Sequence, residues 1–351
     1  MFSIEEYGLD YYIPVNCQKE YEKIANSSLS VSEKIMELLT VNPGFMTVTG
    51  NNREEKRYKS FKYKSSLKII QSRVDKEEKL VFFSLSFNTK PHIGEITNGL
   101  VYPDAADFLT LLHLNLSFKY INQIYKPGAE LRIGSQFVYF RKFNVVSVEQ
   151  AKEMTNMVYL YNDVAEKLVG TSDKVKIFDI YQEISPIKKE FFLKVEQAKL
   201  DIIQEEKGLE EIRKGADYYM NFVLDERQFP NKEAAWNFCM YHTLDSAAYK
   251  RAVLTMGDFG DGLFKGFSHT IMAETRFQTG SNLVEYADVV YISFLPGAST
   301  YAFNRLTLHR ADQTWELATY QHLLDIKADE RFVKELKHPF FFVENKNGQS
   351  I

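Results

Sequence analysis

The segment Leu80–Phe87, which reads LVFFSLSF, constrains the fold of this chain more than any other stretch. Aromatic and aliphatic residues fill it almost completely, which predicts a buried strand. A loop is expected over residues 88–102, because one proline and two glycines interrupt any regular element there. A second run of the same kind, Val289–Leu295 (VVYISFL), predicts another buried strand late in the chain.

A helix is expected after this loop. Pro103 and Asp104 open it, since proline is tolerated in a first turn and an acidic residue there complements the helix dipole. Apolar residues at helical spacing continue until a Pro-Gly pair ends the pattern. Two strands are then expected at Ala129–Ile133 and Phe137–Phe140, with Gly134-Ser135 as the turn of a hairpin between them.

The remaining elements follow from the same patterns. Further helices are expected at residues 32–39 (with Ser32 as N-cap), 148–168, 188–214, 232–256 and 265–286, and further strands at 45–49, 174–180 and 302–308, the last beside 289–295. This order of strands, a helical middle and strands again predicts an α/β fold with a three-layer, Rossmann-like core. We interpret residues 1–351 as a single α/β domain with a mainly helical insertion near 150–256.

Composition narrows the class of protein. The chain has 351 residues, of which 45% are hydrophobic and 26% are charged, so it can bury a sizeable core. Its net charge of −4 argues against nucleic acid as a partner, because nucleic-acid binders usually show a strong basic excess. One basic run, Arg53–Lys68, is interrupted by glutamates; we interpret it as a solvated surface, with binding of an anionic substrate as the alternative.

The same sequence favours a cytoplasmic protein. No positively charged start leads into an apolar core, and no apolar run reaches 18 residues, so neither a signal peptide nor a membrane span is expected. The two cysteines, Cys17 and Cys239, form no CxxC pair, which fits a reducing compartment better than a disulfide framework.

Motifs for metals and nucleotides are missing from the sequence. No two of the seven histidines lie three to five residues apart, and no H-x-D/E pair occurs, so no metal is expected. No P-loop, no GxGxxG after a strand and no GxSxG elbow is found, and the triplet Asp258-Phe259-Gly260 lacks every other kinase element. We therefore expect no cofactor.

Candidate functional residues follow the first buried strand. Asn88 and Lys90 come just past its end, in the glycine-containing loop, where ligands sit in open α/β sheets. An ammonium at this place can hold a phosphate or carboxylate, or, if desolvated, act as a base or form a Schiff base. The alternative is an ordinary surface lysine.

Three charged residues extend this candidate site. Asp104 and Asp107 lie one helical turn apart at the start of the next helix, where they can move protons or simply complement the helix dipole. Arg132 points opposite to its apolar neighbours in the following strand. It faces either solvent or a pocket in which its guanidinium clamps an anion.

Residues 86–140 resemble the isonitrile synthase family, also known as pyoverdine/dityrosine biosynthesis proteins. The resemblance rests on an ordered set of residues at matching spacing: Phe87, Lys90, Gly99, Pro103, Asp104, Asp107, Tyr125, Pro127, Gly128, Ala129 and Ser135. A second, shorter similarity involves Lys265, Arg276, Ser293 and Pro296.

The chain also departs from the family pattern. Gln136 follows Ser135 where the family usually has aspartate, and Asp107 stands in place of a glutamate. Leu295 stands where a histidine commonly precedes the proline of the later strand, and the C-terminal TPWH is absent. These differences mark a divergent member and leave open whether its substrate, or even its reaction, is that of the family.

The resemblance implies an enzyme of secondary metabolite biosynthesis that converts the amine of tyrosine or tryptophan into an isonitrile. The carbon comes from ribulose 5-phosphate, and neither metal nor nucleotide is needed. It implies that Lys90 and Arg132 bind phosphate or carboxylate and that Asp104 moves protons. The other substrate-binding candidates are Asn88, Asp107, Ser135, His269 and Arg276.

Two alternatives remain open from the sequence. One is an enzyme on the same scaffold that acts on an amine or amino acid but releases another product. The other is a binding protein without catalysis. For either enzyme, the expected partners are an amino acid and a sugar phosphate, and neither nucleic acid nor a membrane is expected. The oligomeric state is left open.

Overall fold

The computed structural model describes most of the chain. The described residues are 15–41, 46–48, 52–86, 90–91, 100–101, 103–135, 148–179, 188–222, 231–255, 271–275, 288–292, 306–312, 315–318, 320–332 and 339–345.

A parallel sheet forms the centre of the molecule. Its strands are β2 (Leu80–Ser86), β5 (Ala129–Ser135), β6 (Val175–Asp179), β7 (Ile271–Thr275) and β8 (Asp288–Ile292). They lie in the order β6-β5-β2-β7-β8, and every neighbouring pair is parallel. Counted along the chain this order is 3-2-1-4-5. The α/β class expected from the sequence is confirmed by this sheet and the helices around it.

Two long helices cover one face of this sheet. Helix α4 (Ala105–Ile124) packs on β5, and α6 (Val148–Val169) packs on α4 and β6. Phe82 and Leu131, which are paired in register, are both fully buried on this face. The Phe82 ring meets Phe118 of α4 edge-on at 5.6 Å. Apolar residues at alternate positions of each strand thus fix which face carries the helices.

Three N-terminal helices extend the same core around α4. They are α1 (Val15–Ala25), α2 (Val31–Thr40) and α3 (Asn52–Val74). Helices α1 and α2 pack directly on α4, and α3 packs on α2 and β8. The expected N-cap Ser32 is wrong by two residues, because Ser30 caps α2 and forms a capping box with Glu33. The basic run in α3 is helical.

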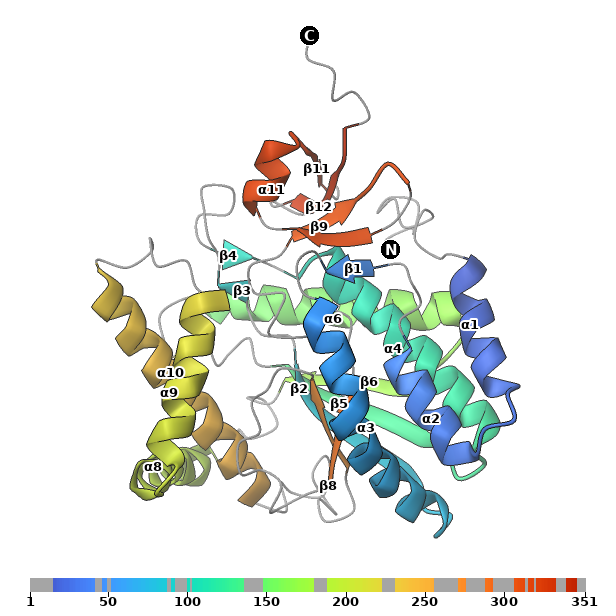
Figure 1. Ribbon diagram of the computed structural model, residues 1–351, viewed down its shortest axis with the longest axis horizontal. Helices are drawn as coiled ribbons and strands as arrows, with labels where there is room; N and C mark the ends of the chain where they lie inside the picture. The colour runs from blue at the N-terminus through green and yellow to red at the C-terminus, as the bar shows by residue number, and fades with distance from the viewer. Residues whose placement is uncertain are drawn as a thin grey trace.

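A second, mixed sheet lies beside the start of α4 (Figure 1). It contains β1 (Met46–Val48), β9 (Leu306–His309), β10 (Trp315–Ala318), β11 (Asp329–Phe332) and β12 (Pro339–Val343) in the order β1-β10-β9-β12-β11. Strand β1 is parallel to β10 and β12 is parallel to β9, whereas the other two pairs are antiparallel. A short helix, α11 (Tyr320–Asp325), and a two-stranded ribbon, β3 (Lys90–Pro91) with β4 (Leu100–Val101), complete this part.

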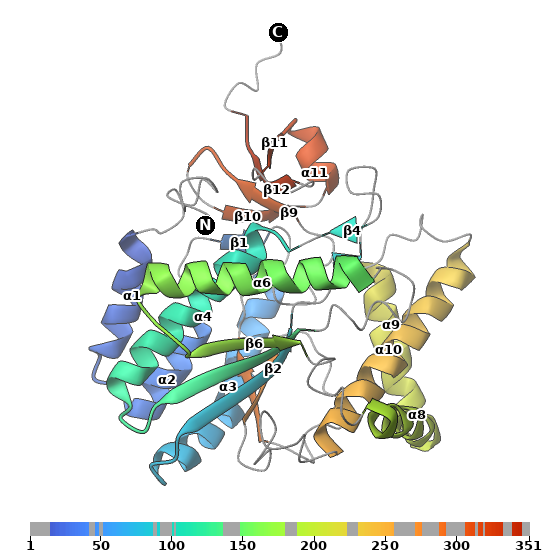
Figure 2. The same ribbon diagram turned by 180° about the vertical axis from the view of Figure 1, so that it is seen from behind.

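Three helices form a separate bundle at one side of the molecule (Figures 1 and 2). They are α8 (Lys188–Gln204), α9 (Gly208–Phe222) and α10 (Lys232–Thr255), and they pack chiefly on one another. The bundle lies between β6 and β7 in the chain. The single long helix expected at 188–214 is wrong, because a short turn ends α8 before Gly208 begins α9.

Three further expectations are corrected by the sheets. Gly134 and Ser135 are not a hairpin turn but the last residues of β5, which runs parallel to both neighbours. The helix expected at 265–286 contains strand β7 instead. The strand expected at 302–308 does not lie beside β8, because β9 belongs to the mixed sheet. In each case a strand partner that is distant in sequence determines which secondary structure forms and in which sheet it lies. The strand expected at 137–140 lies outside the described residues.

Candidate functional site

Several of the residues that the sequence singles out follow the ends of three neighbouring strands along the chain. Strands β5, β2 and β7 lie side by side and parallel, so their carboxyl ends share one edge of the sheet. Figure 2 shows the arrowheads of β2, β5 and β6 pointing toward the side that carries the bundle. Ser135 ends β5, Lys90 follows β2 in β3, and Arg276 comes directly after β7 in the sequence.

The structure describes these candidates unequally. It gives the backbone of Lys90 and Ser135, whereas Asn88, His269 and Arg276 lie outside the described residues. The side chains of Asp104, Asp107 and Arg132 are described in full, so the detailed geometry rests on them.

Asp104 is a buried carboxylate at the start of α4, beside the mixed sheet. It precedes the first residue of α4, and only 2% of its surface is exposed. The hydroxyl of Thr307, on β9 of the mixed sheet, donates to its Oδ2 at 3.3 Å. The preceding carbonyl, that of Pro103, accepts a hydrogen bond of 3.0 Å from the Tyr161 hydroxyl of α6. A strand of the mixed sheet and a helix that covers the parallel sheet therefore hold this carboxylate at the start of α4.

Asp107 caps the helix that Asp104 begins. Its Oδ2 accepts a hydrogen bond of 2.9 Å from the backbone N–H of Asp104, and the side chain is buried. This is half of a capping box, with aspartate at the third helical position where glutamate or glutamine is usual. The departure from glutamate at this position of the family pattern therefore leaves the helix start intact.

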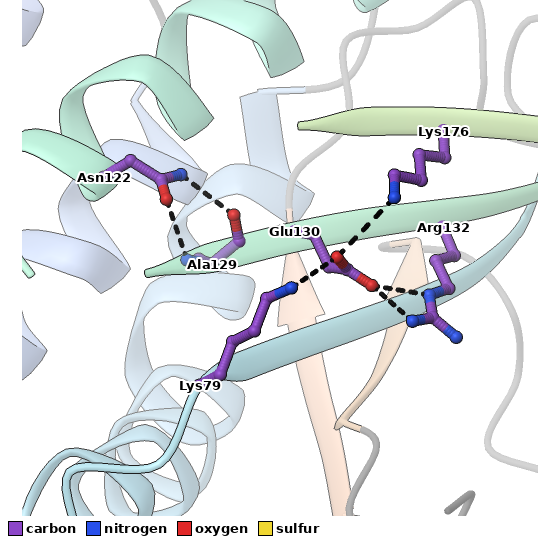
Figure 3. A network of polar contacts seen from close by, with 6 residues as sticks. All are labelled: Lys79, Asn122, Ala129, Glu130, Arg132 and Lys176. Carbon is purple, nitrogen blue, oxygen red and sulfur yellow. Dashed lines mark hydrogen bonds and ion pairs between the residues drawn. The ribbon is translucent and has the colours of Figure 1, made fainter. Parts of the chain in front are cut away.

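Arg132 belongs to an ion-pair network on the other face of the parallel sheet (Figure 3). Its guanidinium lies 2.5 Å from Oε1 of Glu130, two residues earlier on the same strand. Lys79 lies 2.7 Å from Oε2 of the same carboxylate, and Lys176 of β6 lies 3.9 Å from it. Glu130, which the sequence analysis did not single out, is thus the centre of three cations.

The network keeps Glu130 ionised although it is only 4% exposed. Burial raises the pKa of this carboxyl, but the hydrogen bonds from Lys79 and Arg132 outweigh burial and lower the pKa below its ordinary value. One signal could have found this residue: Glu130 and Arg132 alternate with buried Leu131 and Ile133, so both must share the opposite face.

The turn before β5 explains why part of the family-like pattern lies far from the carboxyl edge. Gly128 adopts a φ of +82°, a conformation that favours glycine. Asn122 binds both the N–H and the C=O of Ala129, at 3.0 and 2.9 Å, and the Tyr125 hydroxyl donates to the Glu78 carbonyl at 2.6 Å. These contacts hold the amino ends of β2 and β5 together, so the residues of this part of the pattern stabilise the fold.

Two kinds of feature are absent from the described residues. No helix among them is long and apolar enough to cross a membrane. Within the same part of the chain, no group of three histidine, cysteine or acidic side chains is placed to hold a metal ion.

Fold and site together define an α/β protein with a parallel sheet, a second mixed sheet and a buried carboxylate at the start of α4. No protein-family model matches the sequence, and no curated protein matches it. Among solved structures, PvcA from Pseudomonas aeruginosa is similar, with a TM-score of 0.58 at 12% sequence identity. The similarity covers 90% of this chain and 100% of PvcA, so the two proteins share a fold over nearly their whole lengths.

Proposed function

We propose that this chain is an isonitrile synthase-like enzyme that acts on an amino acid and ribulose 5-phosphate in the cytoplasm. One observation carries the proposal: the segment that resembles the family forms the β2–α4–β5 unit, with Lys90, Asp104 and Ser135 on its carboxyl side. PvcA, a structural neighbour of that same family, shares the fold. Sequence pattern and fold therefore point to one family by separate routes.

The strand order supports the location of the substrate. The order 3-2-1-4-5 is that of the first five strands of a Rossmann-like, doubly wound sheet, in which ligands bind at the carboxyl ends where the order reverses. Here the reversal falls between β2 and β7. In the chain, Lys90 follows the first of these strands and Arg276 follows the second, so we expect both residues to flank the ligand.

Among the weaker candidates, strand β7 favours Arg276 over His269. In the sequence His269 precedes the amino end of β7 by two residues, and Arg276 follows its carboxyl end. Five strand residues span roughly 15 Å, so the two positions belong to opposite ends of the strand. We assign Arg276 to the anionic group of a substrate.

The proposed roles follow from charge and burial. Lys90 binds the phosphate or carboxylate, with Arg276 as its partner. Asp104 moves protons while the amine condenses with the sugar carbonyl, because its carboxylate is buried and hydrogen-bonded at the correct side of the sheet. Arg132 ranks behind them, since Glu130 already binds its guanidinium.

The test is a direct assay. The purified full chain is incubated with tyrosine or tryptophan and ribulose 5-phosphate, and mass spectrometry is used to detect the isonitrile. We expect Lys90→Ala and Asp104→Asn to lose about a hundredfold or more of the activity. Lys126→Ala, at an exposed lysine in the turn before β5, is the matched control and should keep it. No isonitrile from any common amino acid would reject this reaction.

A second candidate is a related enzyme with another product. Gln136 and Leu295 favour it, because they replace an aspartate and a histidine of the family pattern by groups that cannot exchange protons. The same assay distinguishes the two: ribulose 5-phosphate that is consumed with an amine, without any isonitrile, supports this candidate. Binding of both compounds without turnover would instead indicate a binding protein.

A further inference from the structure

Thr307 lies where it can control the orientation of Asp104. It belongs to β9 of the mixed sheet, is 1% exposed and donates its hydroxyl to Oδ2 of Asp104 at 3.3 Å. Asp104 is itself 2% exposed, so water has little access to either group. A buried carboxylate depends on hydrogen bonds from the protein, and the hydroxyl of Thr307 supplies one of them.

The backbone that carries Thr307 is held from both sides. Strand β9 lies inside the mixed sheet, between β10 and β12. Thr307 is paired in register with Leu317 of β10, and the next residue, Leu308, is paired with Phe342 of β12. A β-branched side chain such as that of threonine is also restricted in its rotamers. The donor is therefore fixed in place before it meets the carboxylate.

The backbone of Asp104 is held in a comparable way. Its N–H donates to the Asp107 carboxylate at 2.9 Å, and the Tyr161 hydroxyl donates to the preceding carbonyl, that of Pro103, at 3.0 Å. These contacts fix the main chain of Asp104, whereas its carboxylate can still rotate about the side-chain bonds. The hydrogen bond from Thr307 restricts this remaining rotation.

We propose that Thr307 is a positioning residue for Asp104: its hydroxyl holds the carboxylate in the orientation from which Asp104 exchanges protons with the substrate. The inference rests on the proposed function for the chemistry of Asp104. Thr307 touches no substrate in this role and acts through Asp104 alone. It lies 203 positions after Asp104 in the chain, so the site requires the mixed sheet as well as the β2–α4–β5 unit.

The alternative is a purely structural hydrogen bond that ties β9 to α4. The two roles predict different results for Thr307→Val, in which a methyl group replaces the hydroxyl at nearly the same volume. A positioning role predicts that kcat falls about tenfold while KM for ribulose 5-phosphate is nearly unchanged. A structural role predicts lower stability, with full activity for the fraction of the protein that is folded.

Carbon-13 NMR of the aspartate carboxyl groups tests the hydrogen bond without any substrate. The resonance that is missing in Asp104→Asn belongs to Asp104. We expect Thr307→Val to shift this resonance and Thr307→Ser, which keeps the hydroxyl, to leave it near its position in the parent. An unchanged resonance in Thr307→Val overturns the proposal. This measurement does not depend on whether the chain makes an isonitrile, because it needs no turnover.

Kinetics then test the role in catalysis. Thr307→Ser should recover most of the kcat that Thr307→Val loses, and Thr307→Val should cause no further loss in a chain that already carries Asp104→Asn. Thr243→Val is the matched control and should keep the kcat of the parent, because the Thr243 hydroxyl donates to the Cys239 carbonyl in the bundle, at 2.7 Å. Circular dichroism checks that each variant is folded, and Thr307→Ala replaces Thr307→Val if valine is not tolerated.

The outcomes separate this proposal from the proposed function. An active parent with an equally active Thr307→Val, a loss that serine does not restore, or a loss confined to KM rejects the positioning role alone. A parent that turns over ribulose 5-phosphate with an amine but forms no isonitrile rejects the isonitrile reaction, and the same comparison of variants on that turnover still decides the role of Thr307. A parent without any turnover rejects the proposed function and this role together.

Discussion

Helices α4 and α8 are of similar length, yet their surroundings differ completely. In α4, every described side chain from Asp107 to Phe118 is buried, whereas α8 buries one stripe and exposes the other. Among the described residues, α4 packs on α1, α2, α6, β5, β6 and β9, whereas α8 packs chiefly on α9 and α10. A helix enclosed on all sides needs a hydrogen-bond partner within the protein for each of its polar groups, whereas the exposed polar groups of a helix at the edge can bond to water.

The interior of α4 shows how this requirement is met. Ser117 donates to the Leu38 carbonyl at 2.6 Å. Asn115 donates to Asn162 of α6 at 3.0 Å, and Asn162 donates in turn to the Val175 carbonyl of β6, also at 3.0 Å. Thr171 closes the group by donating to Asn115 at 3.2 Å. Polar residues of α4 therefore connect it to α2, to α6 and to the turn that follows α6.

The largest loss of stability is expected from a cavity beside α4. Phe118→Ala removes a fully buried ring that meets Phe82 edge-on, and should lower the free energy of unfolding by about 3–5 kcal/mol. Leu193→Ala on the exposed face of α8 should change it by less than about 0.5 kcal/mol. Urea denaturation of the two variants measures both. Equal losses would mean that the contrast between the helices is not one of packing.

The bundle contains one place where a single change should also be costly. Lys199 lies 2.5 Å from Asp245 of α10, and both side chains are almost fully buried. Lys199→Met leaves a buried carboxylate without its cation and should destabilise the protein by about 3 kcal/mol. Lys199→Met combined with Asp245→Leu should recover most of this loss, since no buried charge remains. If the double variant is as unstable as the single one, the ion pair is not the cause.

Stability should depend on pH through His113 of α4. Burial lowers the pKa of His113 to about 4, and a backbone hydrogen bond with Leu39 opposes this only weakly. An unfolded histidine titrates near 6.5, so below that pH the unfolded chain binds a proton that the folded chain does not. Stability should therefore be complete above pH 6.5 and fall by about 3 kcal/mol as the pH drops toward 4.

A matched variant isolates this effect. His113→Gln keeps a polar group beside the Tyr21 hydroxyl, which bonds to Nδ1 of the imidazole, but cannot titrate. Urea midpoints measured between pH 7 and 4.5 should change less with pH in this variant than in the parent. A parent and variant with the same slope would show that another group controls the acid response.

The sequence predicts local elements well and long-range pairing poorly. Periodicity located α4, α6, α10 and the strands β2, β6 and β8 within a few residues, because each depends on its own apolar pattern. The mixed sheet could not be assembled in this way. Its strand β1 precedes β10 by more than 260 residues, and nothing in the short segment 46–48 specifies that partner.

The same division applies to the candidate site. Lys90 and Asp104 could be proposed from the sequence because chain order places them after a buried strand. The contact of Asp104 with Thr307 was not found, since it joins residues 203 positions apart. Glu130 was also missed, because its three cations come from two other strand regions and from its own strand.

A substitution at the start of α4 should lower the stability of the protein less than one in its interior. Asp107→Ala removes the acceptor for the Asp104 N–H and should cost about 1 kcal/mol of stability. Asp107→Glu should keep the cap, because glutamate is usual at this position. Activity of Asp107→Ala, corrected for its folded fraction, should match the parent if Asp107 only caps the helix. A specific loss of activity would place Asp107 among the substrate-binding residues instead.

The smallest change of stability is expected at the start of α8. Lys189→Glu replaces a cation by an anion at the amino end of the helix, where the dipole favours negative charge, so the protein should gain a few tenths of a kcal/mol. Thermal unfolding of the variant and the parent measures this difference. A loss of stability in the variant would mean that Lys189 supports the bundle through contacts of its side chain, and that the exposed helix α8 depends on more than its dipole.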